Sequence, residues 1–137
     1  WNVFFMEILN ELRTLISGII SGMIIFQSVI VAPLIFKFFE QEKAGPFLRS
    51  IFPKLFISVF LLGLVSLIIS FYLKNNLSSK IIPICTIVAM VICYLLIPFI
   101  NEARDSGETI LFNRLHTLTV LLTVFVLIAN LGQIFFK

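Results

Sequence analysis

The chain has 137 residues, of which 60% are hydrophobic and only 12% are charged, with a formal net charge of +3 and a pI near 9.1. A soluble domain is excluded, because a chain this small and this apolar could not hide its apolar surface from water. The ten Lys and Arg residues are spread along the chain without a basic block, so the sequence gives no support to nucleic-acid binding.

The first twelve residues have the pattern of an amphipathic helix. Apolar side chains recur at helical spacing, and polar side chains occupy the opposite face. The apolar set is Trp1, Phe4, Phe5, Ile8, Leu9 and Leu12, and the polar set is Asn2, Glu7, Asn10 and Glu11. The pattern predicts an N-terminal amphipathic helix that lies in the membrane interface, with a contact surface for a larger membrane complex as the alternative.

Four later stretches contain no Asp, Glu, Lys or Arg: residues 14–36, 55–73, 81–101 and 115–136. A helix needs roughly 20 residues to cross a hydrocarbon core about 30 Å thick, so each stretch fits one crossing. The alternating pattern of a membrane β-barrel does not occur in the sequence. We therefore predict an all-α integral membrane four-helix bundle, in which residues 1–137 form a single transmembrane domain.

Stripes of small residues run along the first three spans, and such stripes allow helix backbones to approach closely. The seam predicted in the first span, against another helix of the same chain in preference to a second copy, consists of Ser17, Gly18, Ser21, Gly22 and Ser28. Shorter seams contain Gly63, Ser66 and Ser70 in the second span and Thr86, Ala89 and Cys93 in the third. Four helices packed in this way leave no lumen, so a channel within one chain is not expected.

The connections at residues 37–54 and 102–114 share one side of the membrane, because four crossings bring both termini to the other side. These connections carry six basic residues, namely Lys37, Lys43, Arg49, Lys54, Arg104 and Arg114, against four on the terminal side, namely Arg13, Lys74, Lys80 and Lys137. The positive-inside rule places the two connections in the cytoplasm and the termini outside it. Aromatic residues mixed with charges over residues 38–54 predict a loop at the level of the lipid headgroups.

One face of the fourth span carries nearly all of its polar side chains. At 100° per residue, His116, Thr119, Thr123 and Asn130 fall within about 60° of one another, with Thr109 and Phe112 aligned below them. Because contact between these polar side chains and lipid would cost free energy, we expect this face to point into the bundle. His116 lies one turn inside the span, across from four charged residues of the last connection: Glu102, Arg104, Asp105 and Glu108.

Several roles are open to His116. A histidine beside carboxylates can relay protons or bind a metal or haem. Alternatively, its role is structural, and it hydrogen-bonds to a carboxylate of the connection. The spacing of His, Cys and carboxylates matches no metal signature, and no catalytic motif occurs, so we predict neither a metal site nor an enzyme. Haem ligation would require a second ligand from Met23, Met90 or another copy of the chain.

Cys85 and Cys93 lie about 12 Å apart along one helix, which is too far for a disulfide.

Four stretches resemble a family of small bacterial four-span membrane proteins defined as a domain of unknown function and similar to the eukaryotic transmembrane protein 205. They are GMIIFQSVIVAPLIF at residues 22–36, IFPKLF at 51–56, NEARDSG at 101–107 and FNRLH at 112–116. The family pattern in the fourth span is matched by Phe112, Leu115 and His116. Thr119 stands where the pattern has Ser and keeps the hydroxyl, whereas Thr123 stands where it has Asn and loses the amide. The resemblance implies a four-span fold, the bacterial inner membrane and no settled activity.

The expected function is that of a non-catalytic accessory or scaffold subunit in a larger membrane assembly, or of a homo-oligomer, without a cofactor. The amphipathic start and the small-residue seam of the first span favour this interpretation. Two alternatives remain: a protein that handles small molecules or ions with the His116 face, and a haem-associated redox protein. The partners expected in every case are the lipid bilayer and other membrane proteins.

Overall fold

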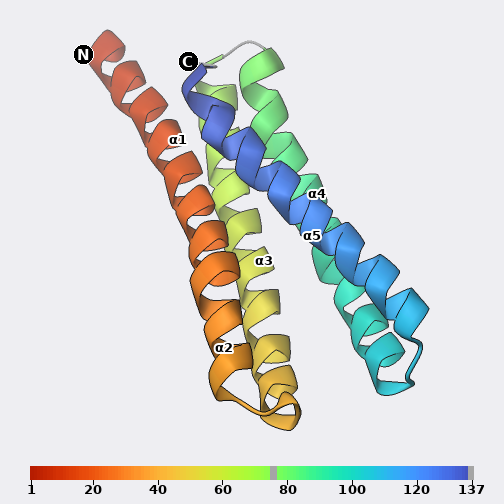
Figure 1. Cartoon of the computed structure of the whole chain (residues 1–137). Helices are drawn as coiled ribbons and strands as arrows, with labels where there is room; N and C mark the ends of the chain where they lie inside the picture. Colours follow the sequence, from red (N-terminus) through yellow and green to blue (C-terminus); the bar gives the residue numbers. More distant parts are fainter. Residues whose placement is uncertain (75–76, 136–137) are drawn as a thin grey trace.

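The computed structural model consists of two helical hairpins packed side by side, and it describes residues 1–74 and 77–135, apart from the side chain of Ser78 (Figure 1). Its elements are α1 (Asn2–Ile25), the π-helical segment η1 (Phe26–Val31), α2 (Ala32–Phe38), α3 (Gln41–Tyr72), α4 (Leu77–Asp105), α5 (Thr109–Leu131) and the 3-10 segment η2 (Gly132–Phe135). The described residues form no strand. The predicted all-α four-helix bundle is confirmed.

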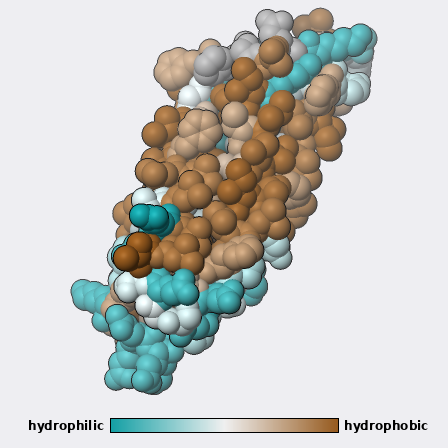
Figure 2. Space-filling model, turned by 90° about the vertical axis from the view of Figure 1, so that its right-hand side faces the viewer, coloured by the Kyte–Doolittle hydropathy of each residue, from teal (hydrophilic) through white to brown (hydrophobic). Residues whose placement is uncertain are grey.

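In the described part of the chain, four continuous helical stretches are long and apolar enough to cross a membrane: Asn2–Phe38, Gln41–Tyr72, Ser79–Asp105 and Thr109–Phe135. No more than 33% of the apolar window in any of them is buried inside the chain, so most of their surface must face lipid or another protein. Figure 2 shows the result as a broad hydrophobic band with hydrophilic side chains at both ends of the molecule. The chain is an integral membrane protein.

The N-terminal segment does not form a separate helix that turns into the interface. Residues 2–13 are the beginning of α1, which continues without a break into the first span. The reason is that no Gly or Pro occurs before Gly18, so a helix once started propagates through this region. The 37 residues from Asn2 to Phe38 would extend roughly 55 Å, well beyond a 30 Å core. Near its start, α1 contacts the end of α3, where the rings of Phe5 and Tyr72 meet edge to face with centroids 6.2 Å apart.

The predicted headgroup-level loop at residues 38–54 is mostly helix. Because α3 begins at Gln41, only Phe39 and Glu40 connect it to α2. Ala44 and Leu48, one turn apart, are buried against Ile35 of α2, and this small cluster stabilises the extension of α3.

The small-residue seams of the second and third spans are confirmed. An added Cβ on Gly63 of α3 would lie 3.2 Å from Cγ1 of Ile87 and 3.3 Å from Cγ2 of Thr86 on α4, so the two backbones approach closely at this glycine. Ser66, Ser70, Thr86, Ala89 and Cys93 are all buried in the same region. α3 and α4 therefore form the tightly packed centre of the bundle.

The predicted seam of the first span divides into three parts. Ser17 and Ser21 are buried, and the Ser21 hydroxyl donates to the Ser17 carbonyl at 2.8 Å. Gly18 and Gly22 face outward, and a Cβ added to either would meet no atom within 4 Å. Among the residues that the structure describes, the two glycines thus pack against no other helix, which corrects the expectation of intrachain packing for them. Ser28 belongs to a different environment, the wall of a cavity.

Arg13 is completely buried at the end of the bundle that holds the termini. Its guanidinium donates from Nη1 to Oδ1 of Asn10 at 3.0 Å and from Nη2 to the carbonyl of Ser79 at 3.1 Å. The residue four positions after Ser79 is Pro83, which has no N–H and cannot make the helical hydrogen bond to that carbonyl. Arg13 therefore donates to a carbonyl that Pro83 cannot serve, and this hydrogen bond joins α1 to α4.

Candidate functional site

A cavity of about 880 Å³ lies between the two hairpins, towards the end of the bundle that carries the α2–α3 and α4–α5 connections. All four long helices contribute to its wall. The sequence had predicted helices packed without a lumen; this cavity corrects that expectation at one end of the bundle, and the expected absence of a channel stays a prediction. The cavity exists because α1 meets α5 near the C-terminal end of α5, where Val126 joins Ile16, Ile20 and Ile24 in the main core, and the two helices then diverge towards the α4–α5 turn (Figure 1).

The π-helical segment lies in the wall contributed by the first span. Pro33 cannot donate to the carbonyl of Val29 four residues earlier, and the wider π turn shifts the donor to the fifth residue. This pattern is seen in the hydrogen bond from the N–H of Ala32 to the carbonyl of Gln27. Ser28, Val29 and Ala32 line the cavity from this segment and the start of α2.

The predicted polar face of α5 divides between the cavity and the core. His116, Thr119 and Thr123 line the cavity. Asn130 instead donates from Nδ2 to Oγ1 of Thr86 at 2.9 Å and to the carbonyl of Val126 at 2.8 Å, in the buried interface between α4 and α5. The helical wheel placed these residues together correctly, but Asn130 lies two turns beyond Thr123 and has a structural role.

The two threonines of the cavity present hydrogen-bond acceptors to it. Thr119 donates its hydroxyl to the carbonyl of His116 at 2.8 Å, and Thr123 donates to the carbonyl of Thr119 at 2.7 Å. Because each hydroxyl has only one proton, its remaining capacity is that of an acceptor. The Sγ of Cys93, on α4, lies 3.8 Å from the same Thr119 carbonyl.

His116 is held by an aromatic ring and not by a carboxylate. Its imidazole stacks on the ring of Phe112, one turn earlier on α5, with centroids 5.6 Å apart and planes inclined by 4°. The guanidinium of Arg104, on α4, lies over the same Phe112 ring at 5.5 Å. Arg104, Phe112 and His116 therefore form a continuous stack across the α4–α5 hairpin. Within the described residues the imidazole makes no hydrogen bond, so the predicted partner among the carboxylates of the connection is not found.

The acidic residues of the predicted site lie outside the cavity wall. Asp105 forms a two-pronged ion pair with Arg49 of α3, at 2.5 Å from Nη2 to Oδ1 and 3.0 Å from Nη1 to Oδ2. Glu102 is exposed on α4, and Glu108 lies on the turn. Across residues 1–74 and 77–135, no three His, Cys, Asp or Glu side chains come together as a possible metal site.

The haem alternative lacks a second ligand near His116. Met90 is fully buried in the main core, and Met23 packs against the same core. Among the described residues that line the cavity, none is a methionine. A His–Met pair from one chain is therefore not available at this cavity.

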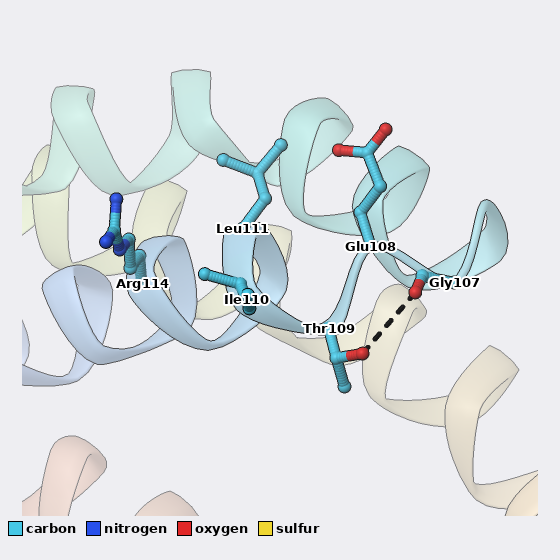
Figure 3. Close-up of a pocket in the computed structure, with 6 residues that line it drawn as sticks. All are labelled: Gly107, Glu108, Thr109, Ile110, Leu111 and Arg114. Carbon is cyan, nitrogen blue, oxygen red and sulfur yellow. Dashed lines mark hydrogen bonds between the residues drawn. The ribbon is translucent and has the colours of Figure 1, made fainter.

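The turn between α4 and α5 sets the position of the stack. Gly107 adopts φ = +75°, a left-handed conformation that favours glycine. The N–H of Glu108 bonds to the carbonyl of Ala103 at 2.9 Å and that of Gly107 to the carbonyl of Arg104 at 3.3 Å, which is the pattern of a Schellman motif. Figure 3 shows the outer side of this turn, a shallow depression of about 440 Å³ in which Thr109 donates to the Gly107 carbonyl at 3.4 Å. Glu108 and Arg114 stand at opposite ends of the depression, so their charges do not converge on one point (Figure 3).

Comparison with known families gives a match over residues 15–108 to the model described as Domain of unknown function (DUF4149). The chain belongs to this family. The family resemblance predicted from the sequence is thereby confirmed, whereas the similarity to transmembrane protein 205 stays a prediction. No match is found among the curated proteins or among the solved structures.

The range matched to the DUF4149 family ends at Glu108. It covers the cavity-lining residues of α1, η1, α2, α3 and α4 and leaves out α5. His116, Thr119 and Thr123 lie beyond it. Sequence reasoning missed Asn101 as a cavity residue, although its spacing of three residues from Arg104 places both on one face of α4. It also missed the apolar wall, which no local pattern distinguishes from lipid-facing surface.

Proposed function

We propose that this chain is a non-catalytic membrane protein that binds one amphiphilic molecule of the bilayer in the cavity between its hairpins. The cavity itself supports this proposal. Its volume of about 880 Å³ falls within the ~300–1,000 Å³ typical of sites for small ligands. Most of its wall is apolar, and its polar side chains are few, as expected for a ligand with an apolar body and a polar end.

The rim of the cavity favours entry from the bilayer. Val29 and Phe36 on the first span and Val120 and Val124 on α5 line the cavity and are exposed. These apolar side chains belong to helices whose surfaces face lipid. A ligand that already lies in the bilayer can therefore reach the cavity between α1–α2 and α5 without crossing a polar barrier.

The side chains in the wall support binding without catalysis. A nucleophile needs an adjacent base, and a general base needs a proton donor within about 3 Å. The imidazole of His116 packs on Phe112, and the hydroxyls of Thr119 and Thr123 donate to backbone carbonyls. No described side chain of the cavity forms a nucleophile–base pair.

Purification of the full chain in a mild detergent, followed by native mass spectrometry and lipid extraction, tests the proposal. We expect about one phospholipid-sized molecule to stay bound to each chain after delipidating washes, because withdrawing an acyl chain from the cavity exposes apolar surface. Chains that lose all lipid as readily as a control four-helix membrane protein without a cavity would contradict the proposal.

A second function, as an accessory or scaffold subunit, is favoured by the outward face of Gly18 and Gly22. This GxxxG pair is open to a helix of another chain, because within the described residues a Cβ added to either glycine would meet no atom of another helix within 4 Å. The same purification distinguishes this function. A stoichiometric protein partner that is lost in Gly22→Leu and retained in Leu121→Ala, a change on the lipid-facing side of α5, would support it.

We place the protein in the bacterial inner membrane with the cavity end towards the cytoplasm. The excess of basic residues at the α2–α3 and α4–α5 connections supports this orientation. A reporter enzyme that works only outside the cytoplasm, fused after residue 137, is expected to be active. Activity of the same reporter inserted at Gly107 and not after residue 137 would reverse the orientation.

A further inference from the structure

The polar end of the cavity carries positive charge and hydrogen-bond donors. Arg49, Arg104 and His116 line it, together with the amide of Asn101. Among the described residues of the wall, none is Asp or Glu. A ligand group placed at this end therefore meets donors and cationic side chains without a competing carboxylate in the wall.

The two arginines differ in how far their charge is already neutralised. The guanidinium of Arg49 is held by both carboxylate oxygens of Asp105. Arg104 is exposed to the cavity and, within the described chain, has no carboxylate within ion-pair distance. The N–H donors of Arg104 thus remain available to a ligand, whereas those of Arg49 are bound to Asp105.

The stack holds Arg104 in place for that role. The ring of Phe112 contacts both the guanidinium, at 5.5 Å from its centroid, and the imidazole of His116, at 5.6 Å between centroids. A guanidinium on an aromatic face keeps its N–H groups in the plane, where they can still donate. Asn101 lies one turn before Arg104 on the same face of α4 and makes no side-chain hydrogen bond to the described residues.

We infer that the bound amphiphile has an anionic phosphate headgroup, which Arg104 binds with the support of Asn101 and His116. Its acyl chain extends towards Ile24, Phe56 and Leu127, deeper in the wall. This inference rests on the proposed function and specifies its ligand. A planar guanidinium with parallel N–H donors matches two phosphate oxygens, and the ligand's net negative charge balances Arg104.

Competition between two lipids in native mass spectrometry tests the inference on the full chain. Phosphatidylglycerol and phosphatidylcholine with identical acyl chains are offered in equal amounts. We expect the wild-type chain to retain phosphatidylglycerol about tenfold more, equivalent to 1.4 kcal/mol. Arg104→Gln is expected to reduce this preference to about twofold or less, while the total amount of bound lipid stays close to that of the wild type.

Arg114→Gln is the matched control. It removes a positive charge at the same end of the bundle as Arg104, but from a side chain that lies outside the cavity wall. It should keep the preference. Equal retention of the two lipids by the wild-type chain, or the same loss of preference in Arg114→Gln, would overturn the inference and leave the proposed function standing. Absence of any bound lipid would overturn both. Glycerol 3-phosphate is the soluble probe: displacement of the lipid by it at millimolar concentration would show a free-phosphate site and contradict a lipid ligand.

Discussion

Replacing Thr123 by Phe is expected to reduce retention of the bound lipid strongly. Thr123 lies on the cavity side of α5, and its hydroxyl donates to the Thr119 carbonyl within the same helix. A phenyl ring at this position would occupy the space that we assign to an acyl chain. Overpacking costs typically about 1–3 kcal/mol, which corresponds to roughly 5- to 150-fold in affinity. The measurement is the number of lipid molecules retained per chain after detergent washing.

Thr117→Phe provides the control on the same helix. Thr117 is exposed and lies outside the cavity wall, so the same change of size there should leave lipid retention unaltered. The free energy of unfolding of Thr123→Phe should stay within about 1 kcal/mol of wild type or rise, because the ring fills a void in the apo protein. Equal retention by Thr123→Phe and wild type would show that the cavity is not where the lipid binds.

Most of the fold follows from local properties of the sequence. Charge-free stretches locate the four spans because a charge at membrane depth is costly wherever the helix packs. The seams at Gly63 and Thr86 could be predicted because small residues need only a neighbouring helix, which the second hairpin supplies. The extension of α3 was missed because Ala44 and Leu48 pack on Ile35, a contact that depends on the tight turn at Phe39 and Glu40.

The candidate site could be predicted only in part. Helical periodicity brought His116, Thr119 and Thr123 to one face, since that relation lies within one helix. What this face meets depends on where α1 crosses α5, and the crossing is set by contacts between residues more than 100 positions apart, such as Ile20 and Val126 in one core. The same dependence on distant residues explains why packing within the chain was expected for Gly18 and Gly22, which face outward in the structure. The partner of His116 is the ring of Phe112, one turn earlier on the same helix, whereas the charged residues of the connection favoured a carboxylate.

Arg13→Met is expected to lower the free energy of unfolding by about 1–3 kcal/mol, the cost of leaving a buried polar group without its hydrogen bond. Nη2 of Arg13 donates to the Ser79 carbonyl, which Pro83 cannot reach with an N–H of its own. Removing a buried charge also relieves desolvation, and this opposes the loss. The single variant therefore mixes two effects, and a second substitution is needed to separate them.

Pro83→Ala supplies the missing N–H and gives that second substitution. In the Pro83→Ala background, the helical hydrogen bond can serve Ser79, so Arg13→Met should cost less than half of what it costs alone. The difference is the coupling between the two residues, for which contacting pairs give about 0.5–3 kcal/mol. Unfolding in mixed micelles of dodecyl sulfate, followed by circular dichroism, measures all four proteins. Arg114→Met, a change at an exposed arginine, should stay within about 0.5 kcal/mol of wild type. An identical cost of Arg13→Met in both backgrounds would mean that Arg13 does not compensate for the proline.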